Sequence, residues 1–276
     1  MKSNKYLLKK SYLYSYAVIS GVSTITGILG YTIKDAFKAF SWWQCSLMLI
    51  FLFFIITFSI FYILLIFNKK GFSIIINGVS VSIKIGDIFK KDGLKVIPFN
   101  ERYDTIVDDV VISHTSLNGQ MIDKNAEKIE DINETIRTAE NTNSKFAPIM
   151  KGNTLIYPLG KIIKFEDCLM LAMSHFDNQN RAYININEYE GMLYNMWEEL
   201  RRVYAGKKIV LPLIGGGITT LNGTKEKDSN ALLKCMLCTF RRSKFQPNNG
   251  IEIVLTQKAV ENMDLFKIKE EFKNDI

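Results

Sequence analysis

Cysteine and histidine are scarce in this chain of 276 residues, which contains four and two of them respectively. The cysteines show no framework spacing, and such sparse cysteines suit a reducing compartment better than a disulfide-stapled secreted protein. Cys235 and Cys238 have the spacing of half a zinc site, but no second pair of ligands accompanies them. We therefore expect neither a metal site nor a cofactor, and interpret both cysteines as small apolar residues of a helix.

A long basic stripe interleaved with aromatic residues is also absent, although the formal net charge is +7. Many lysines instead flank two apolar segments of the chain: Lys2, Lys5, Lys9, Lys10, Lys69 and Lys70. Lysines in such positions are typical of membrane topology signals and of attraction to anionic lipid headgroups. The sequence therefore favours a lipid bilayer as a partner and disfavours nucleic acid.

Charged residues are missing altogether from residues 46–67, which consist largely of Leu, Ile and Phe. A helix of this length spans about 33 Å, enough to cross the hydrocarbon core of a bilayer at about 30 Å. Trp42 and Trp43 lie at one end, as interfacial anchors should, and Lys69 and Lys70 lie at the other. The segment predicts a transmembrane helix.

Residues 14–33 are a weaker second span, uncharged but rich in Ser, Thr and Gly. Ser23 lies four residues before Gly27, and Thr26 four residues before Gly30, so small residues share one helix face. Small residues at that spacing let a neighbouring helix approach closely. We interpret this span as a packing helix that contacts the second span or other protomers.

No small-residue cleavage site follows the first span, which argues against a removed signal peptide. Lysines precede the first span and follow the second, whereas the loop 34–43 carries few charges. The positive-inside rule then places both termini in the cytoplasm. We expect residues 1–71 to form a two-helix transmembrane hairpin and residues 72–276 to form one cytoplasmic domain.

Alternating strand and helix patterns fill residues 72–276. Asn77-Gly78 predicts a hairpin between two strand-like runs within 72–85. The other predicted strands are 94–99, 154–159, 167–176, 209–214 and 251–255. The predicted helices are 123–141, 188–204, 229–242 with Ser229 as its cap, and a final charged helix, whereas 103–122 gives no clear pattern. Such alternation indicates a three-layer α/β/α domain with a mixed sheet.

Three glycines, Gly215 to Gly217, directly follow the buried strand 209–214. Without Cβ atoms, their backbone N–H groups can close on anionic oxygens, above all those of phosphates. No Gly-Lys-Ser/Thr follows, so this is not a nucleoside-triphosphatase loop, and the spacing is not Gly-x-Gly-x-x-Gly either. A plain tight turn is the alternative interpretation.

Two further polar segments could complete such a site. Asp87 follows a predicted strand, where its carboxylate could accept a hydrogen bond from the exocyclic amine of adenine; a helix cap is the alternative. Residues 116–120, Ser-Leu-Asn-Gly-Gln, form a polar loop suited to phosphate or ribose, or merely an ordinary turn.

Together these segments resemble the macro domain, an ADP-ribose-binding fold. The matching residues are the Gly-Asp-Ile segment 86–88 and the Leu-Pro-Leu-Ile-Gly-Gly-Gly-Ile segment 211–218. Two membrane helices before such a domain, with segments 97–104 and 116–120, are similar to the transmembrane–macro effectors of bacterial type II Thoeris anti-phage defence.

The resemblance implies a role for each matching residue. Asp87 and Ile88 would hold adenine. The diphosphate would lie on the loop formed by Gly215, Gly216, Gly217, Ile218 and Thr219. The distal ribose would face Asn100 and the loop that contains Ser116, Gly119 and Gln120.

The resemblance also implies a receptor in the bacterial inner membrane. A partner TIR-domain enzyme would consume NAD and make an ADP-ribose-derived signal, a histidine conjugate in type II systems. Binding would rearrange a homo-oligomer of the membrane helices, disrupt the membrane and abort infection.

Hydrolytic macro domains carry an Asn-Ala-Ala-Asn segment, of which only Asn100 is matched here, so we expect binding without catalysis. One alternative is a membrane-tethered ADP-ribosyl hydrolase or nucleotide phosphoesterase that uses Glu101 and Asp104. Another is a scaffold that binds only protein.

Overall fold

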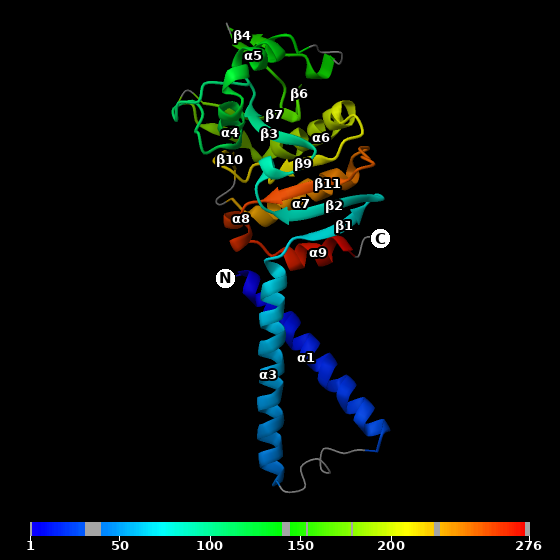
Figure 1. Cartoon of the computed structure of the whole chain (residues 1–276). Coiled ribbons are helices and arrows are strands. Elements are labelled where there is room, and N and C mark those ends of the chain that lie inside the picture. Colours follow the sequence, from blue (N-terminus) through cyan, green and yellow to red (C-terminus); the bar gives the residue numbers. More distant parts are fainter. Residues whose placement is uncertain are drawn as a thin grey trace. The chain divides into compact units, whose positions relative to one another are not determined.

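The computed structural model describes residues 2–30, 40–139, 144–152, 154–177, 179–223 and 227–273. It divides into a helical unit, residues 1–70 with 264–267, and an α/β unit, residues 71–263 with 268–276 (Figure 1).

The helical unit contains α1 (Lys2–Ile28) and α3 (Trp42–Asn68). The main-chain N–H of Ser41 donates to Gln44 Oε1 at 3.0 Å, which satisfies a donor at the start of α3. Within the described residues, α3 is the one helix long and apolar enough to cross a membrane. The structure thus supports one of the two predicted spans; α1 begins far earlier than residue 14, and its Lys and Ser residues lower its hydropathy. The loop predicted at 34–43 lies largely outside the described residues.

The two helices pack through a polar seam rather than through glycines. Leu7, Ser11 and Ser15 of α1 are fully buried, and Thr57 of α3 donates to Ser15 Oγ at 3.0 Å. Residues 20–30 are all exposed, and a Cβ at Gly27 would meet nothing within 4 Å. The first span therefore contacts α3, as predicted, but not through the Ser23–Gly27 face, and contact of that face with other protomers stays a prediction. A hydrogen bond between two hydroxyl groups satisfies both groups in apolar surroundings, which explains why α1 and α3 are in contact at Ser15 and Thr57.

The α/β unit contains a mixed sheet, as predicted, and this sheet has nine strands within the described residues. The strands are β1 (Phe72–Ile76), β2 (Val79–Ile85), β3 (Leu94–Asn100), β4 (Ile149–Lys151), β5 (Thr154–Ile156), β6 (Ile162–Phe165), β7 (Cys168–Phe176), β8 (Ala182–Asn185), β9 (Ile209–Pro212), β10 (Thr220–Asn222) and β11 (Ile251–Leu255). Their order in the sheet is β1-β2-β11-β9-β3-β7-β8-β10, with β6 beside β7; β4 and β5 pair separately. β2, β11, β9, β3 and β7 are mutually parallel, so their carboxyl ends share one edge.

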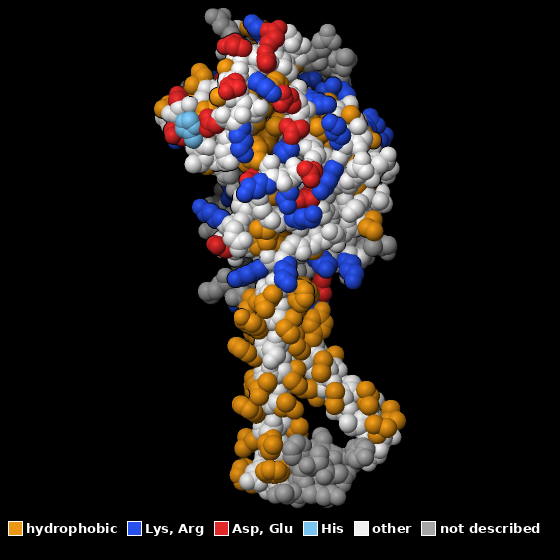
Figure 2. Space-filling model, viewed as in Figure 1, with side chains coloured by type: hydrophobic (Ala, Val, Ile, Leu, Met, Phe, Trp, Pro, Cys, Tyr) orange, Lys and Arg blue, Asp and Glu red, His pale blue; other side chains and the backbone are white. Residues whose placement is uncertain are grey.

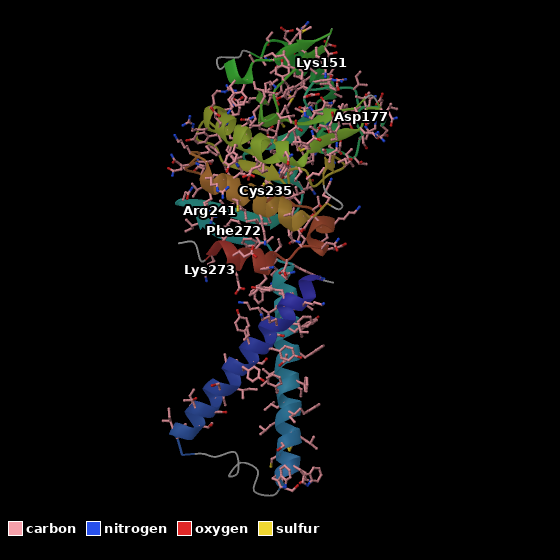
Figure 3. The ribbon with its side chains drawn as sticks, turned by 180° about the vertical axis from the view of Figure 1, so that it is seen from behind. Lys151, Asp177, Cys235, Arg241, Phe272 and Lys273 are labelled. Atoms are coloured by element: carbon pink, nitrogen blue, oxygen red, sulfur yellow. The ribbon has the colours of Figure 1, made fainter. Side chains whose placement is uncertain are left out.

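Helices cover both faces of this sheet. They are α4 (Leu117–Lys124), α5 (Ile129–Arg137), α6 (Ile186–Val203), α7 (Ser229–Arg242), α8 (Gln257–Glu261) and α9 (Leu265–Lys273). On one face, Met121 of α4 and Ile132 of α5 join Ile97 and Met170 of the sheet in one core cluster. On the other, α6 and α7 pack together, and Trp197 Nε1 donates to Thr239 Oγ1 at 3.0 Å. Figure 3 shows this second face, where α7 carries the labelled Cys235 and Arg241. The predicted three layers are confirmed.

Most predicted elements form, but helix 123–141, the cap of α7 and strand 154–159 differ from the prediction. The Asn77-Gly78 hairpin is confirmed, because both residues adopt the positive φ angles that such a turn requires. The predicted helix 123–141 begins only at Ile129, since the Asn125 side chain donates to Met121 O and ends α4 first. Asp228, not Ser229, caps α7.

The predicted strand 154–159 is shorter than expected. β5 ends at Ile156 and pairs only with β4, outside the main sheet. Tyr157 instead donates its N–H to Glu101 O at 2.8 Å, and Pro158 has no N–H to extend a ladder.

A buried carboxylate binds three lysines on the sheet. Glu252 of β11 is 1% exposed and forms ion pairs with Lys84 and Lys91, both at 3.2 Å, and with Lys208. Burial alone would raise the pKa of Glu252, but hydrogen bonds from the lysines lower it to about 2. Figure 2 shows how lysines and arginines mix with carboxylates over the α/β unit, whereas apolar side chains cover α1 and α3.

We expect Glu252→Gln to destabilise the full chain in detergent by up to about 3 kcal/mol at pH 7, because a lowered pKa means that the ionised form stabilises the fold. This contribution is present above the ordinary pKa of 4.5 and is lost as pH falls toward 2, so the difference should shrink in acid. Urea unfolding measures it. Glu166→Gln, which removes an exposed ion pair with Lys128, is the control and should cost less than about 1 kcal/mol. Equal effects of both variants would contradict the interpretation.

Candidate functional site

A cavity of about 610 Å³ lies at the carboxyl edge of the parallel strands. Chain segments at the ends of β3, β7, β9 and β11 line it, together with residues before and within the first turn of α4. This placement follows from the topology, because parallel strands release their connecting loops at one edge, where ligands of open α/β sheets bind.

The glycine loop after β9 forms one wall of the cavity. Gly215 has a φ of +77°, which other residues rarely adopt, and Gly216 donates its N–H to Leu213 O at 2.9 Å. Tyr189 of α6 anchors the loop by donating its hydroxyl to Ile214 O at 2.7 Å. A Cβ at Gly217 would meet no protein atom within 4 Å, so the cavity side of the loop is open.

Lys227 fixes the direction of the loop amides. Its ammonium donates to Gly217 O at 2.5 Å and to Thr219 O at 2.6 Å. In a trans peptide the N–H points opposite to the carbonyl, so the N–H groups of Ile218 and Thr220 point away from Lys227. The N–H groups of Gly217 and Ile218 have no acceptor among the described residues. Burial lowers the pKa of Lys227.

Eight of the eleven residues predicted for the site line the cavity: Asn100, Ser116, Gln120, Gly215, Gly216, Gly217, Ile218 and Thr219. Asp87, Ile88 and Gly119 do not line it. The structure thus brings together three segments that are far apart in the sequence, 98–100, 111–120 and 212–220.

Asp87 stands beside the cavity rather than in its wall. Its carboxylate accepts from Phe89 N at 2.9 Å and caps the short helix η1 (Ile88–Lys90). Gly86 donates to Leu255 O at 3.0 Å, and the next residue, Thr256, lines the cavity. Asp87 therefore lies at the neighbouring strand end, while the Ile88 side chain is buried in the core.

Residues 116–120 are not a loop but the cap and first turn of α4. Ser116 Oγ accepts from Gly119 N at 3.1 Å, and Gln120 Nε2 donates to Thr115 O at 3.0 Å. A Cβ at Gly119 would lie 2.2 Å from Ser113 O, so close packing explains this glycine. The N-terminus of α4 nonetheless faces the cavity through Ser116 and Asn118.

The amide of Asn100 shapes the chain after β3. Its Oδ1 accepts from Arg102 N at 2.9 Å and from Asp104 N at 3.2 Å, while its Nδ2 donates to Asp104 Oδ2 at 2.9 Å. Asn100 is 2% exposed. Its side chain therefore holds the turn that follows β3 as well as lining the cavity.

Arg181 is a cavity residue that the sequence interpretation missed, and it is the only charged residue among those that line the cavity in the described part of the chain. It belongs to the turn before β8, a strand too short to be evident from the sequence. A pair of oppositely charged residues four apart, Asp177 and Arg181, was the available signal.

A histidine bound by two carboxylates lies next to the ends of β3 and β7. His175 Nδ1 is 2.5 Å from Glu101 Oε2, and its Nε2 is 3.5 Å from Glu188 Oε2. The hydrogen bond with Glu101 raises the pKa of His175 against the effect of burial. Glu101 and Asp104, the carboxylates considered for catalysis, are both hydrogen-bonded within the chain and do not line the cavity. Among the described residues, no group of three or more His, Cys, Asp or Glu side chains is arranged so that it could hold a metal ion.

We expect the His175 pair to make stability pH-dependent. A histidine with a raised pKa stabilises the fold fully below pH 6.5, and this stabilisation is lost as pH rises through the folded-state pKa. The full chain in detergent should therefore lose stability just above pH 6.5, and His175→Gln should lose less. Urea midpoints from pH 6 to 9 measure the effect. The chain has one other histidine, His114, which is exposed; its hydrogen bond with Asp123 also raises its pKa, but solvent screens this pair, so His114→Gln should change the profile far less than His175→Gln. An unchanged profile in His175→Gln would refute the assignment.

Comparisons with known proteins identify the family of this chain. The family model "Thoeris protein ThsA, Macro domain" matches residues 81–256. The curated Thoeris protein ThsA of Bacillus amyloliquefaciens (strain Y2) is 36% identical over 214 residues, which cover 73% of this chain and 70% of the relative.

Solved macrodomains of Oceanobacillus iheyensis are more distant. A variant with ADPR has a TM-score of 0.48 and 14% identity, covering 73% of this chain and all of that one. Another variant has a TM-score of 0.46 and 15% identity, with 73% and 99% covered. The family match and the curated relative decide the assignment: this chain belongs to the ThsA macro domain family.

Proposed function

We propose that this protein is a membrane-anchored receptor whose α/β unit binds an ADP-ribose-derived signal. The observation that carries the proposal is the glycine loop, where main-chain N–H groups that have no acceptor in the described part of the chain border a cavity of about 610 Å³. A volume of this size falls within the range of small-molecule sites. The chain also belongs to the ThsA macro domain family and is 36% identical to a Thoeris protein, which supports the same role.

The cavity suits an elongated anion. From β11 to β8 the sheet order takes four steps, β11-β9-β3-β7-β8. At about 4.8 Å a step, the strand ends cover about 19 Å, comparable to an extended dinucleotide. Adenine would lie near Asp87 and Thr256, the diphosphate on the glycine loop, and the distal ribose beside Asn100 and α4.

Main-chain donors are well suited to the diphosphate. The open N–H groups of Gly217 and Ile218 present partial positive charge to phosphate oxygens without a side chain that must be ordered first. Lys227 holds the peptide planes that carry the N–H groups of Ile218 and Thr220, so the Ile218 donor is oriented before the ligand arrives. A binding role without hydrolysis is part of this proposal, and it is supported because Glu101 and Asp104 are hydrogen-bonded within the chain and do not line the cavity.

The membrane anchor completes the proposal. α3 would cross the bacterial inner membrane, α1 would form the second span, and both termini would lie in the cytoplasm. A partner TIR-domain enzyme would supply the signal, a histidine conjugate of ADP-ribose, and binding would rearrange a homo-oligomer and disrupt the membrane. Shifting such a receptor from mostly inactive to mostly active requires a difference of about 5 kcal/mol in ligand affinity between the two states.

We expect Gly217→Leu to abolish ADP-ribose binding without unfolding the protein. No protein atom lies within 4 Å of a Cβ at this position, so the new side chain fits but projects into the space beside the glycine loop. Isothermal titration of the full chain in detergent measures binding, and thermal unfolding checks the fold.

Gly191→Leu in α6 is the matched control, since a Cβ there also meets nothing within 4 Å and the residue does not line the cavity. It should bind ADP-ribose like the parent chain. Unchanged binding by Gly217→Leu would place the ligand elsewhere, and no binding by the parent chain to ADP-ribose or its histidine conjugate would refute the proposed function.

A further inference from the structure

The cavity wall is almost free of charge. Its polar residues are amides and hydroxyls, and Arg181 is the only charged residue among the described residues that line it. The main-chain N–H groups of the loop after β9 can already bind an anionic diphosphate. The presence of one cation and no carboxylate in the wall therefore needs a separate explanation.

Arg181 is held by the turn from which it projects. Asp177 Oδ1 accepts from Gln179 N at 2.8 Å and from Arg181 N at 2.9 Å, while Asp177 Oδ2 accepts from Arg181 Nε at 2.8 Å. These bonds, first of all the one from Arg181 N, lower the pKa of Asp177 and keep it ionised. Figure 3 labels Asp177 on this part of the α/β unit.

The outer nitrogens of the guanidinium remain available. Only Nε of the Arg181 side chain is hydrogen-bonded among the described residues, which leaves Nη1 and Nη2 to bind a ligand. The side chain is 70% exposed, so desolvation costs it little in the free protein. A guanidinium held along one edge presents its other edge as a planar pair of donors, which matches a carboxylate or a phosphate.

The position of Arg181 along the sheet indicates which part of the ligand it meets. It stands before β8, whereas Thr256 follows β11 and the glycine loop follows β9. A ligand with its adenine near β11 and its diphosphate at β9 would present its far end to β7 and β8. The group that reaches Arg181 is therefore attached to the distal ribose.

We infer that Arg181 recognises a negatively charged group on the distal ribose, so that an ADP-ribose derivative carrying such a group binds more tightly than ADP-ribose itself. This inference rests on the proposed function and specifies its ligand class. The shared chemistry is an anion with at least two acceptor oxygens, either the carboxylate of an attached amino acid or a phosphate.

Isothermal titration of the full chain in detergent tests the inference with four probes. They are ADP-ribose, its conjugate with an amino acid that has a free carboxylate, the methyl ester of that conjugate, and ADP-ribose 1″-phosphate. The ester keeps the shape of the conjugate and removes the negative charge of its carboxylate. The variants are Arg181→Gln, Arg181→Lys and the control Arg201→Gln, an exposed α6 residue outside the cavity wall.

We expect Arg181→Gln to weaken binding of the carboxylate conjugate or of the phosphate about 10- to 100-fold, and binding of ADP-ribose and the ester less than about threefold. Arg181→Lys should restore part of the loss, because it keeps the charge without the planar fork. Which anionic probe responds identifies the carboxylate or the phosphate. Arg201→Gln should bind all four probes like the parent chain.

Equal losses for ADP-ribose and both anionic probes would overturn the inference by placing Arg181 at the diphosphate, while leaving the proposed function intact. Unchanged binding of every probe by Arg181→Gln would overturn it as well. If the parent chain bound none of the four probes, both the inference and the proposed function would fail.

Discussion

The parallel alignment of β2, β11, β9, β3 and β7 is the constraint on which the site depends. It brings the ends of these strands to one edge, where the loop after β9 leaves the N–H groups of Gly217 and Ile218 without acceptors among the described residues. Because both residues are exposed, either water or a bound anion can satisfy these donors. The same edge therefore provides both a cavity and donors for an anion.

Charges that support the fold are kept out of that cavity. Glu252 forms ion pairs with three lysines, and His175 contacts both Glu101 and Glu188, so these carboxylates are already paired. The wall is left with amides, hydroxyls and Arg181. Tyr189 and Lys227 hold the glycine loop from behind, which fixes its donors in the absence of a ligand. The α/β unit is thus suited to recognition through oriented dipoles rather than through proton transfer.

Local chemistry made much of this predictable. The Asn77-Gly78 turn, the buried strand before Gly215 and the amphipathic face that includes Ile132 each carry their own pattern, and the three-layer fold follows from their alternation. β8 and β10 escaped prediction because each is held by its neighbours rather than by its own pattern. Arg181 became part of the site only when β8 placed its turn at the cavity, a long-range effect that spacing does not show. The contact between α1 and α3 differs from the predicted one because buried Ser15 and Thr57 hydrogen-bond each other, whereas the glycines of α1 are exposed.

Hydrogen exchange measured by mass spectrometry on the full chain in detergent tests the central claim most directly. If the glycine-loop amides bind an anionic dinucleotide, saturating ADP-ribose should slow exchange in a peptide that covers residues 213–220. Exchange in the β4–β5 hairpin, which lies in a separate sheet, should not change. Binding of ADP-ribose with no added protection at 213–220 would contradict the account.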